Sequence, residues 1–274
     1  MSYKSILVHA EPGSACARRV GIAVEIAGMF DATLIGVGAE AIFPIVGSAY
    51  ATADSEIIKA VLGRVAADLP AAERNFRELT SASGRPVRWV YAEDYPDRVL
   101  SLHARAADLI VASRPERGDS ATYVVTPADL IMQAGGPVLL VNQTGPDLLA
   151  QSIIVAWKDT RESRRALTDA LPFLERAKQV IIVHVNEKTD VDANKTGLKE
   201  ISERLTRRKI CVNIDLISKC ETSLGQTVQA AADRHGADLI VAGAYGHSRL
   251  REWALGGVTR DLIDFSSKFV LFSH

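Results

Sequence analysis

The hexapeptide ADLIVA occurs twice in this chain, at Ala107–Ala112 and again at Ala237–Ala242. Each copy follows an alanine-rich stretch with helical spacing and has the length and apolar character of a buried strand. The similarity extends outward to two further pairs of segments, SILVHAE at 5–11 with SIIVAWK at 152–158, and GGPVLLVN at 135–142 with SSKFVLFSH at 266–274. Matches in the same order along the chain predict an internal duplication.

Each half alternates short apolar runs with helical patterns, which is typical of βαβ units around a parallel sheet. In the second half strands are expected at 152–157, 179–186, 211–217, 237–243 and 268–273. These runs are apolar without strict alternation, as expected for strands that helices cover on both faces. The sequence therefore predicts an α/β protein made of two doubly wound, five-stranded parallel-sheet domains.

Helices are expected between these strands, the first two at about 161–176 and 196–208. A third begins where Ser223 and Gln226 have the spacing of a capping box, and Gly236 would end it. A chain of 274 residues suffices for two domains. The polar stretch NQTGPDLLAQ at 142–151 is typical of a linker, which places the domains at 1–146 and 147–274.

Composition limits the class of partner. The formal net charge of -1 gives no global field to attract nucleic acid or an acidic membrane, so the expected partner is a small molecule. Cys16, Cys211 and Cys220 are odd in number and lack a C-x-x-C spacing, which favours neither a disulfide framework nor a zinc site. No apolar run approaches the roughly 18 residues of a membrane span. We expect a cytoplasmic protein.

The stretch GAYGHSRLREWALGGVT at 243–259 carries glycines at both ends. It follows the fourth strand of its repeat, and open parallel sheets bind ligands beyond the carboxyl ends of their strands. Gly243 and Gly246 would let the backbone take positive φ, so that N–H groups converge on an anion. Gly256 and Gly257 lead into a helix whose N-terminus favours negative charge. The stretch is a candidate phosphate loop, and the alternative is a tight turn followed by a helix.

The glycine spacing resembles the nucleotide loop of the universal stress protein family, G-x2-G-x9-G followed by Ser or Thr. Gly243, Gly246 and Gly256 satisfy this spacing. The resemblance covers about residues 4–143 and 151–274 and is therefore to the tandem type, with the adenine nucleotide alpha hydrolase-like fold. It implies ATP or another adenine nucleotide as ligand. It also implies pairing between the last strands of two such domains, within this chain or in a homodimer.

On this resemblance the candidate nucleotide site lies in the second half, and one nucleotide is expected per chain. The candidate residues are Ala156, Trp157, Lys158, Val185, Ala242, Gly243, Gly246, His247, Gly256, Gly257, Val258 and Thr259. Gly257 stands where nucleotide binders of the family have Ser or Thr, so a hydroxyl donor is missing. Lys158 stands where they have an Asp near the adenine. The first half lacks the G-x2-G, although Glu11 is an acid at the Asp position.

Several residues near the loop have two interpretations. Trp157 could stack on an adenine or block its pocket, and Trp253 could stack on a base or pack in the core. A set of basic side chains could surround the phosphates or be solvated: Lys158, His247, Arg249, Arg251 and Arg260.

Three other patterns are interpreted structurally. GVGAEA at 36–41 matches part of a dinucleotide fingerprint, but Pro44 follows where the helix should run. The acidic residues at 93–97 fit a helix start at Pro96, so no metal is predicted. His184 lies in a strand and is expected to be a core residue with its hydrogen bonds satisfied.

We expect a stress-response binding protein of tandem universal stress type whose second half binds an adenine nucleotide weakly. The alternative is a structural or interaction module in which neither half binds nucleotide. An enzyme is the third hypothesis, limited to slow ATP hydrolysis, because no Walker, G-x-S-x-G or H-E-x-x-H motif is present and nothing supplies a general base.

Overall fold

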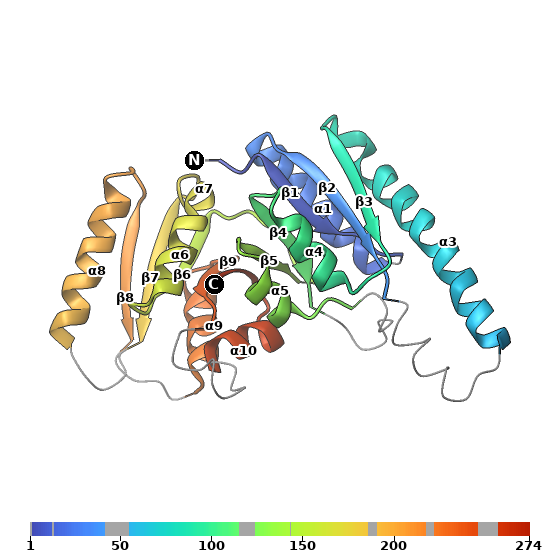
Figure 1. Cartoon of the computed structure of the whole chain (residues 1–274). Helices are drawn as coiled ribbons and strands as arrows, with labels where there is room; N and C mark the ends of the chain where they lie inside the picture. Colours follow the sequence, from blue (N-terminus) through green and yellow to red (C-terminus); the bar gives the residue numbers. More distant parts are fainter. Residues whose placement is uncertain are drawn as a thin grey trace. The chain divides into compact units, whose positions relative to one another are not determined.

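The computed structural model describes residues 2–12, 14–41, 55–114, 124–142, 144–185, 191–217, 222–245 and 257–274. Their contacts divide the chain into two compact units, Ser2–Gly135 and Gly136–His274, called here the N-terminal and the C-terminal unit. Each unit is an α/β layer structure with helices against a sheet (Figure 1).

Within its described ranges the N-terminal unit has four parallel strands in the order β3-β2-β1-β4. The strands are β1 (Ser5–His9), β2 (Thr33–Ala39), β3 (Val87–Ala92) and β4 (Leu109–Ser113). The helices are α1 (Ser14–Phe30), α3 (Ser55–Thr80), α4 (Pro96–Ala104) and α5 (Pro127–Gln133), with a short 3-10 turn at Ser81–Ser83. Helix α1 contacts α3 and α4 contacts α5, and the two pairs cover opposite faces of the sheet (Figure 1).

The C-terminal unit has six strands in the order β5-β10-β9-β6-β7-β8. The strands are β5 (Val138–Val141), β6 (Ser152–Ala156), β7 (Gln179–Val185), β8 (Val212–Ile217), β9 (Leu239–Gly243) and β10 (Phe269–Ser273). The helices are α6 (Arg161–Asp169), α7 (Leu171–Leu174), α8 (Val191–Thr206), α9 (Leu224–Arg234) and α10 (Gly257–Phe265). All neighbouring strands are parallel except β5, which is antiparallel to β10.

The two ADLIVA copies occupy the same place in their units. Leu109 of β4 aligns with Ile6 of β1, and Leu239 of β9 aligns with Ile153 of β6. Both pairs join the first and fourth strands of a repeat in the same register. The predicted duplication and the predicted fold class are therefore confirmed.

Strand β5 is the last strand of the first repeat, yet it belongs to the C-terminal unit. Its residues Val138, Leu139 and Leu140 align with Phe272, Leu271 and Val270 of β10, and all six side chains are buried. The two last strands thus pair within one chain, as expected. The units divide between Gly135 and Gly136 because of this pairing, whereas the predicted boundary between the repeats lies in the linker, after 146.

Local signals in the sequence account for most helix ends. The capping box at α9 is formed, with Ser223 Oγ accepting from Gln226 N at 3.2 Å and Gln226 Oε1 accepting from Ser223 N at 3.3 Å. Gly236 follows α9 with φ of 61°, the left-handed conformation expected there. The single helix predicted at 161–176 is wrong: it breaks at Ala170 into α6 and α7, since Pro172 cannot continue the hydrogen bonding of α6.

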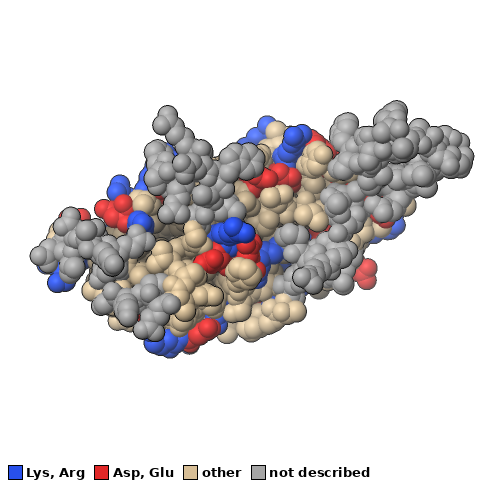
Figure 2. Space-filling model, turned by 90° about the horizontal axis from the view of Figure 1, so that it is seen from below, with Lys and Arg blue, Asp and Glu red and all other residues tan. Residues whose placement is uncertain are grey.

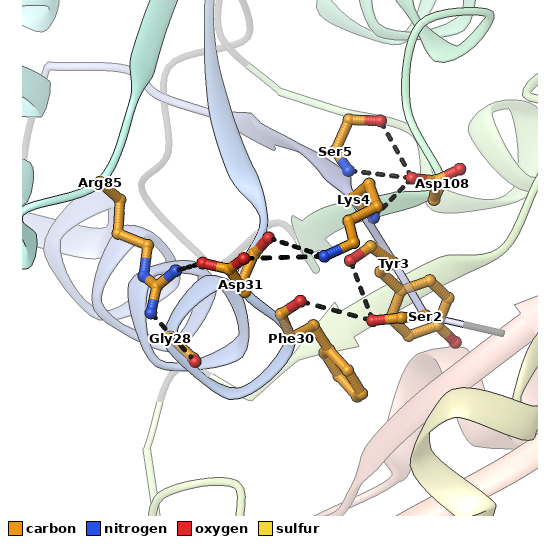
Figure 3. Close-up of polar contacts among 9 residues, drawn as sticks. All are labelled: Ser2, Tyr3, Lys4, Ser5, Gly28, Phe30, Asp31, Arg85 and Asp108. Carbon is orange, nitrogen blue, oxygen red and sulfur yellow. Dashed lines mark hydrogen bonds and ion pairs between the residues drawn. The ribbon is translucent and has the colours of Figure 1, made fainter.

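The aspartate of each ADLIVA motif accepts hydrogen bonds from the backbone at or just before the first strand of its repeat. Asp108 Oδ2 accepts from the backbone N–H groups of Lys4 and Ser5 at 2.7 and 2.9 Å (Figure 3). Asp238 Oδ2 accepts in the same way from the backbone N–H groups at 149–150, at 2.6 and 2.9 Å. These bonds give the aspartate a structural role in both repeats. In the second repeat they anchor the end of the linker to the start of β9.

The glycines of GVGAEA make room for aromatic side chains. A Cβ at Gly36 would lie 2.8 Å from Phe76 Cε1, and one at Gly38 would lie 2.6 Å from Trp89 Cζ2. The rings of Phe76 and Trp89 pack with centroids 5.5 Å apart over this part of β2. Gly36 and Gly38 are therefore packing residues.

Candidate functional site

The carboxyl ends of β6, β7 and β9 form one edge of the C-terminal unit. Ala156, at the end of β6, aligns with Val183 of β7 on one side and Ala242 of β9 on the other. The chain winds from β6 to β7 in one direction and reaches β9 on the opposite side, so the winding reverses between β6 and β9. Ligands of doubly wound sheets bind at such a reversal.

The structure places six of the twelve predicted site residues at this edge: Ala156, Trp157, Lys158, Val185, Ala242 and Gly243. Three more, Gly257, Val258 and Thr259, form the start of α10, the helix that leads from β9 to β10. The other predicted residues of the loop lie outside the described part of the chain: Gly246, His247 and Gly256, and with them Arg249, Arg251 and Trp253.

Trp157 is buried, with 7% of its surface exposed. Its backbone N–H donates to Val183 O at 2.8 Å, and its carbonyl oxygen lies 3.0 Å from His184 Nδ1. The indole is enclosed by protein, which leaves little of the ring for stacking on a base. Lys158 follows it on the exposed side of the edge.

Gly243 has a different role from the one expected. Its φ lies outside the left-handed region, and the positive φ of this turn, 54°, belongs to Tyr245. A Cβ at Gly243 would lie 2.5 Å from Ser163 N and 2.6 Å from Glu162 C, both in the first turn of α6. The expectation of positive φ at Gly243 is thus wrong, and the glycine is needed because the backbone of α6 approaches the end of β9.

The N-termini of the two helices that follow β6 and β9 differ. Helix α6 is capped by its own residues, because Thr160 Oγ1 accepts from Ser163 N at 3.3 Å and the buried Glu162 lies in its first turn. Helix α10 begins at Gly257, which is exposed, and open space surrounds the position that a Cβ would take. Backbone N–H groups at the start of α10 are therefore the better candidates for anion binding.

A buried ionic cluster occupies the corresponding edge of the N-terminal unit. Arg19, on α1, donates from Nε to His9 O at 2.7 Å and from its two Nη atoms to Glu11 Oε2 and Ser113 Oγ. His9 Nδ1 lies 3.0 Å from Glu11 Oε2. His9 and Arg19 are only 2% and 3% exposed. The guanidinium thus bridges the ends of β1 and β4, the place where the winding of this unit reverses.

The charges of this cluster compensate one another. Burial opposes ionisation of Glu11, but Arg19 and His9 together outweigh it and hold the pKa of the carboxyl well below its usual range. Burial also raises the pKa of the neighbouring Cys16 thiol to about 11. The sequence indicated Glu11 but not Arg19. A signal was present, since Arg19 shares a helical stripe with the buried Cys16, Val20 and residues beyond.

Each member of the cluster is replaced at the equivalent position of the second repeat. Counting from the aligned strands, Lys158 corresponds to Glu11 and Gly243 to Ser113. Ala166 corresponds to Arg19. The C-terminal unit therefore carries a cation where the N-terminal unit carries an anion, and it lacks the guanidinium that bridges the two strand ends.

Charged side chains of both signs are present among the described residues. On the face shown in Figure 2, Lys and Arg lie interspersed with Asp and Glu among the described residues. Arg260, a member of the predicted basic rim, pairs with Asp264 of its own helix at 3.4 Å. Within the described ranges no group of three or more His, Cys, Asp or Glu residues could hold a metal ion. No described helix is long and apolar enough to cross a membrane.

Strand order, duplication and a glycine-containing loop after the fourth strand define a tandem, doubly wound α/β protein. Residues 150–273 match the family model described as "Universal stress protein family". This match spans the second repeat, slightly less than half of the chain, and the second repeat is therefore similar to that family. The chain carries two repeats of this fold in tandem.

Two solved structures with TM-scores above 0.5 agree with this fold. A universal stress protein from Archaeoglobus fulgidus DSM 4304 is 15% identical and matches 98% of this chain and 95% of its own, with a TM-score of 0.72. A protein from Pseudomonas aeruginosa UCBPP-PA14, provisionally described as a universal stress protein, is 16% identical over 99% of this chain and 93% of its own, with a TM-score of 0.61. A universal stress protein in complex with cAMP covers 53% of this chain and 100% of its own, at 19% identity and a TM-score of 0.38. No match was found among curated proteins.

Proposed function

We propose that the C-terminal unit binds ATP or a related adenine nucleotide, once per chain, and that the protein is a cytoplasmic stress-response binding protein. The observation that carries this proposal is the start of α10. Its first residue, Gly257, is exposed and has open space around it, and it directly follows Gly256, the last glycine of the family's spacing.

The chemistry of the edge suits a phosphate chain. The first N–H groups of α10 have no partners within their own helix, and the helix dipole adds partial positive charge at the same place. Lys158 adds a cation on the exposed side of β6, where the first repeat has the partly buried carboxylate of Glu11. In the N-terminal unit the buried Arg19 guanidinium bridges the ends of β1 and β4, the equivalent place, which supports a stoichiometry of one.

The test is calorimetric titration of the whole protein with ATP and with cAMP, on the wild type and on Gly257→Ser. A serine fits at this position, because φ of Gly257 lies outside the left-handed region and nothing lies within 4 Å of the added Cβ. Its hydroxyl would restore the donor that nucleotide binders of the family have. A hydrogen bond to a charged group contributes roughly 1.5–3 kcal/mol, so ATP should bind about ten- to a hundredfold more tightly.

Gly197→Ser on α8 is the matched control, since its added Cβ also meets nothing within 4 Å and it lies outside the predicted site. It should leave the affinity unchanged. If neither the wild type nor Gly257→Ser binds nucleotide while both are folded, the binding proposal is wrong. The interaction module would then be favoured, with the buried Trp157 closing the base pocket.

A further inference from the structure

His184 makes one hydrogen bond where two are available. The residue is on β7, with 7% of its surface exposed. Its Nδ1 lies 3.0 Å from the carbonyl oxygen of Trp157, whereas Nε2 is buried and has no hydrogen-bond partner among the described residues. The expectation that His184 is a satisfied core residue is therefore only half right.

The contact with Trp157 determines which ring nitrogen of His184 carries the proton. A carbonyl oxygen only accepts, so the proton must be on Nδ1. In the neutral ring Nε2 is then an acceptor. A buried acceptor without a donor is destabilising, and such atoms are uncommon in folded proteins. Nε2 is thus suited to a donor that the described residues do not supply.

The position of the ring connects it to the nucleotide edge. His184 immediately precedes Val185, and its hydrogen bond reaches the residue that follows β6. The ring therefore lies at the carboxyl ends of β6 and β7. Since neighbouring strands are about 4.8 Å apart, it is about two strand spacings from β9, whose loop would hold the phosphates. A base at the far end of a nucleotide would lie on this side.

The N-terminal unit has no equivalent of this acceptor. The sixth residue of β2 is Gly38, where the sixth residue of β7 is His184. The side of Gly38 is filled by Trp89, which a Cβ would meet at 2.6 Å. The imidazole thus occurs in the unit that carries the glycine loop.

We infer that His184 Nε2 accepts a hydrogen bond from the exocyclic amine of the bound adenine and so determines its selection over 6-oxopurines. This inference rests on the proposed function. A 6-oxopurine such as hypoxanthine presents a carbonyl oxygen at that position, and two acceptors cannot bond. The wild type should therefore bind ATP about tenfold more tightly than inosine triphosphate, the loss expected for one hydrogen bond.

Two substitutions test the roles of the two ring nitrogens separately. His184→Asn keeps a donor near the place of Nδ1 for the Trp157 carbonyl but removes Nε2. His184→Gln keeps a polar atom near the place of Nε2. We expect His184→Asn to lower ATP affinity about tenfold and to leave inosine triphosphate unchanged, while His184→Gln keeps a preference for ATP. His235→Asn is the control, because its ring bonds Asp215 at 2.9 Å at the end of α9.

The outcomes distinguish this inference from the proposed function. If the wild type binds neither triphosphate, both are overturned. If it binds ATP but His184→Asn leaves the ATP to inosine triphosphate ratio unchanged, the role of His184 alone is overturned. Equal weakening of both ligands would also overturn it. Nitrogen-15 NMR of the imidazole gives an independent check, since a ring protonated on Nε2 instead of Nδ1 contradicts the argument.

Discussion

Replacing Arg19 by alanine should destabilise the N-terminal unit by about 3–5 kcal/mol, the cost of breaking a buried ion pair by removing one partner. Arg19 is 3% exposed and donates to His9 O, Glu11 Oε2 and Ser113 Oγ. Without it, the partly buried Glu11 carboxylate has only His9 beside it, at 3.0 Å. The destabilisation follows from this uncompensated charge.

The effect should depend on pH. In the wild type the depressed pKa of Glu11 contributes stability above the unfolded value of about 4.3, and this contribution is lost as pH falls below it. In Arg19→Ala, burial without the guanidinium should raise that pKa, so the ionised carboxylate costs stability at neutral pH. Urea unfolding should therefore show a larger deficit at pH 7.5 than at pH 4.5.

Hydrogen exchange followed by mass spectrometry locates the effect. At pH 7 the amides of β1 and β4 should exchange more than about a hundredfold faster in Arg19→Ala, while β6 and β9 serve as internal reference. Arg98→Ala removes an exposed partner 3.8 Å from Asp94 and should cost less than about 1 kcal/mol. The double variant Glu11→Leu with Arg19→Leu should recover most of the stability. An acceleration below tenfold, or one shared equally by both units, would refute the reasoning.

Three further results are expected. Gly38→Ala should lower stability by about 1–3 kcal/mol because the new Cβ meets an indole carbon at 2.6 Å. Gly21→Ala, in open helix surroundings, should be neutral or stabilising by up to about 1 kcal/mol, and thermal denaturation compares the two variants. Asp238→Ala should cost about 1.5–3 kcal/mol by releasing two backbone N–H groups, and proteolysis of the linker should speed up; unchanged cleavage would contradict this. A fragment 147–274 should self-associate through its unpaired β10 edge, whereas 136–274 should sediment as a monomer; equal sedimentation of both would contradict the argument.

The strands of the second repeat and the equivalence of the two ADLIVA strands could be predicted because the signals are local and occur twice. An apolar run between helical patterns indicates a covered parallel strand, and the repeated ADLIVA fixed the equivalence of β4 with β9. The capping box at Ser223 needs only four residues of sequence. Pro172, which breaks the helix predicted at 161–176, is a local signal of the same kind.

The candidate site was less predictable because its determinants are distant in sequence. Arg19 meets Ser113 94 positions later, and whether an arginine on an apolar helix is buried depends on the partner it finds. The sequence predicts that Gly243 is needed for positive φ, whereas in the structure a glycine is needed there because the backbone of α6 lies too close for a Cβ. The half-satisfied ring of His184 depends on where Trp157 places its carbonyl group.

The antiparallel pairing of β5 with β10 has a consequence for symmetry. Where identical domains from separate chains pair such strands about a two-fold axis, each strand must complement a copy of itself. Here VLLV at 138–141 faces FVLFS at 269–273, two different sequences held in one covalent chain. Neither strand has to complement itself, so a change in one can be matched by a change in the other alone. After the duplication this contact no longer requires a self-complementary strand, so the sequences of the two repeats can diverge independently.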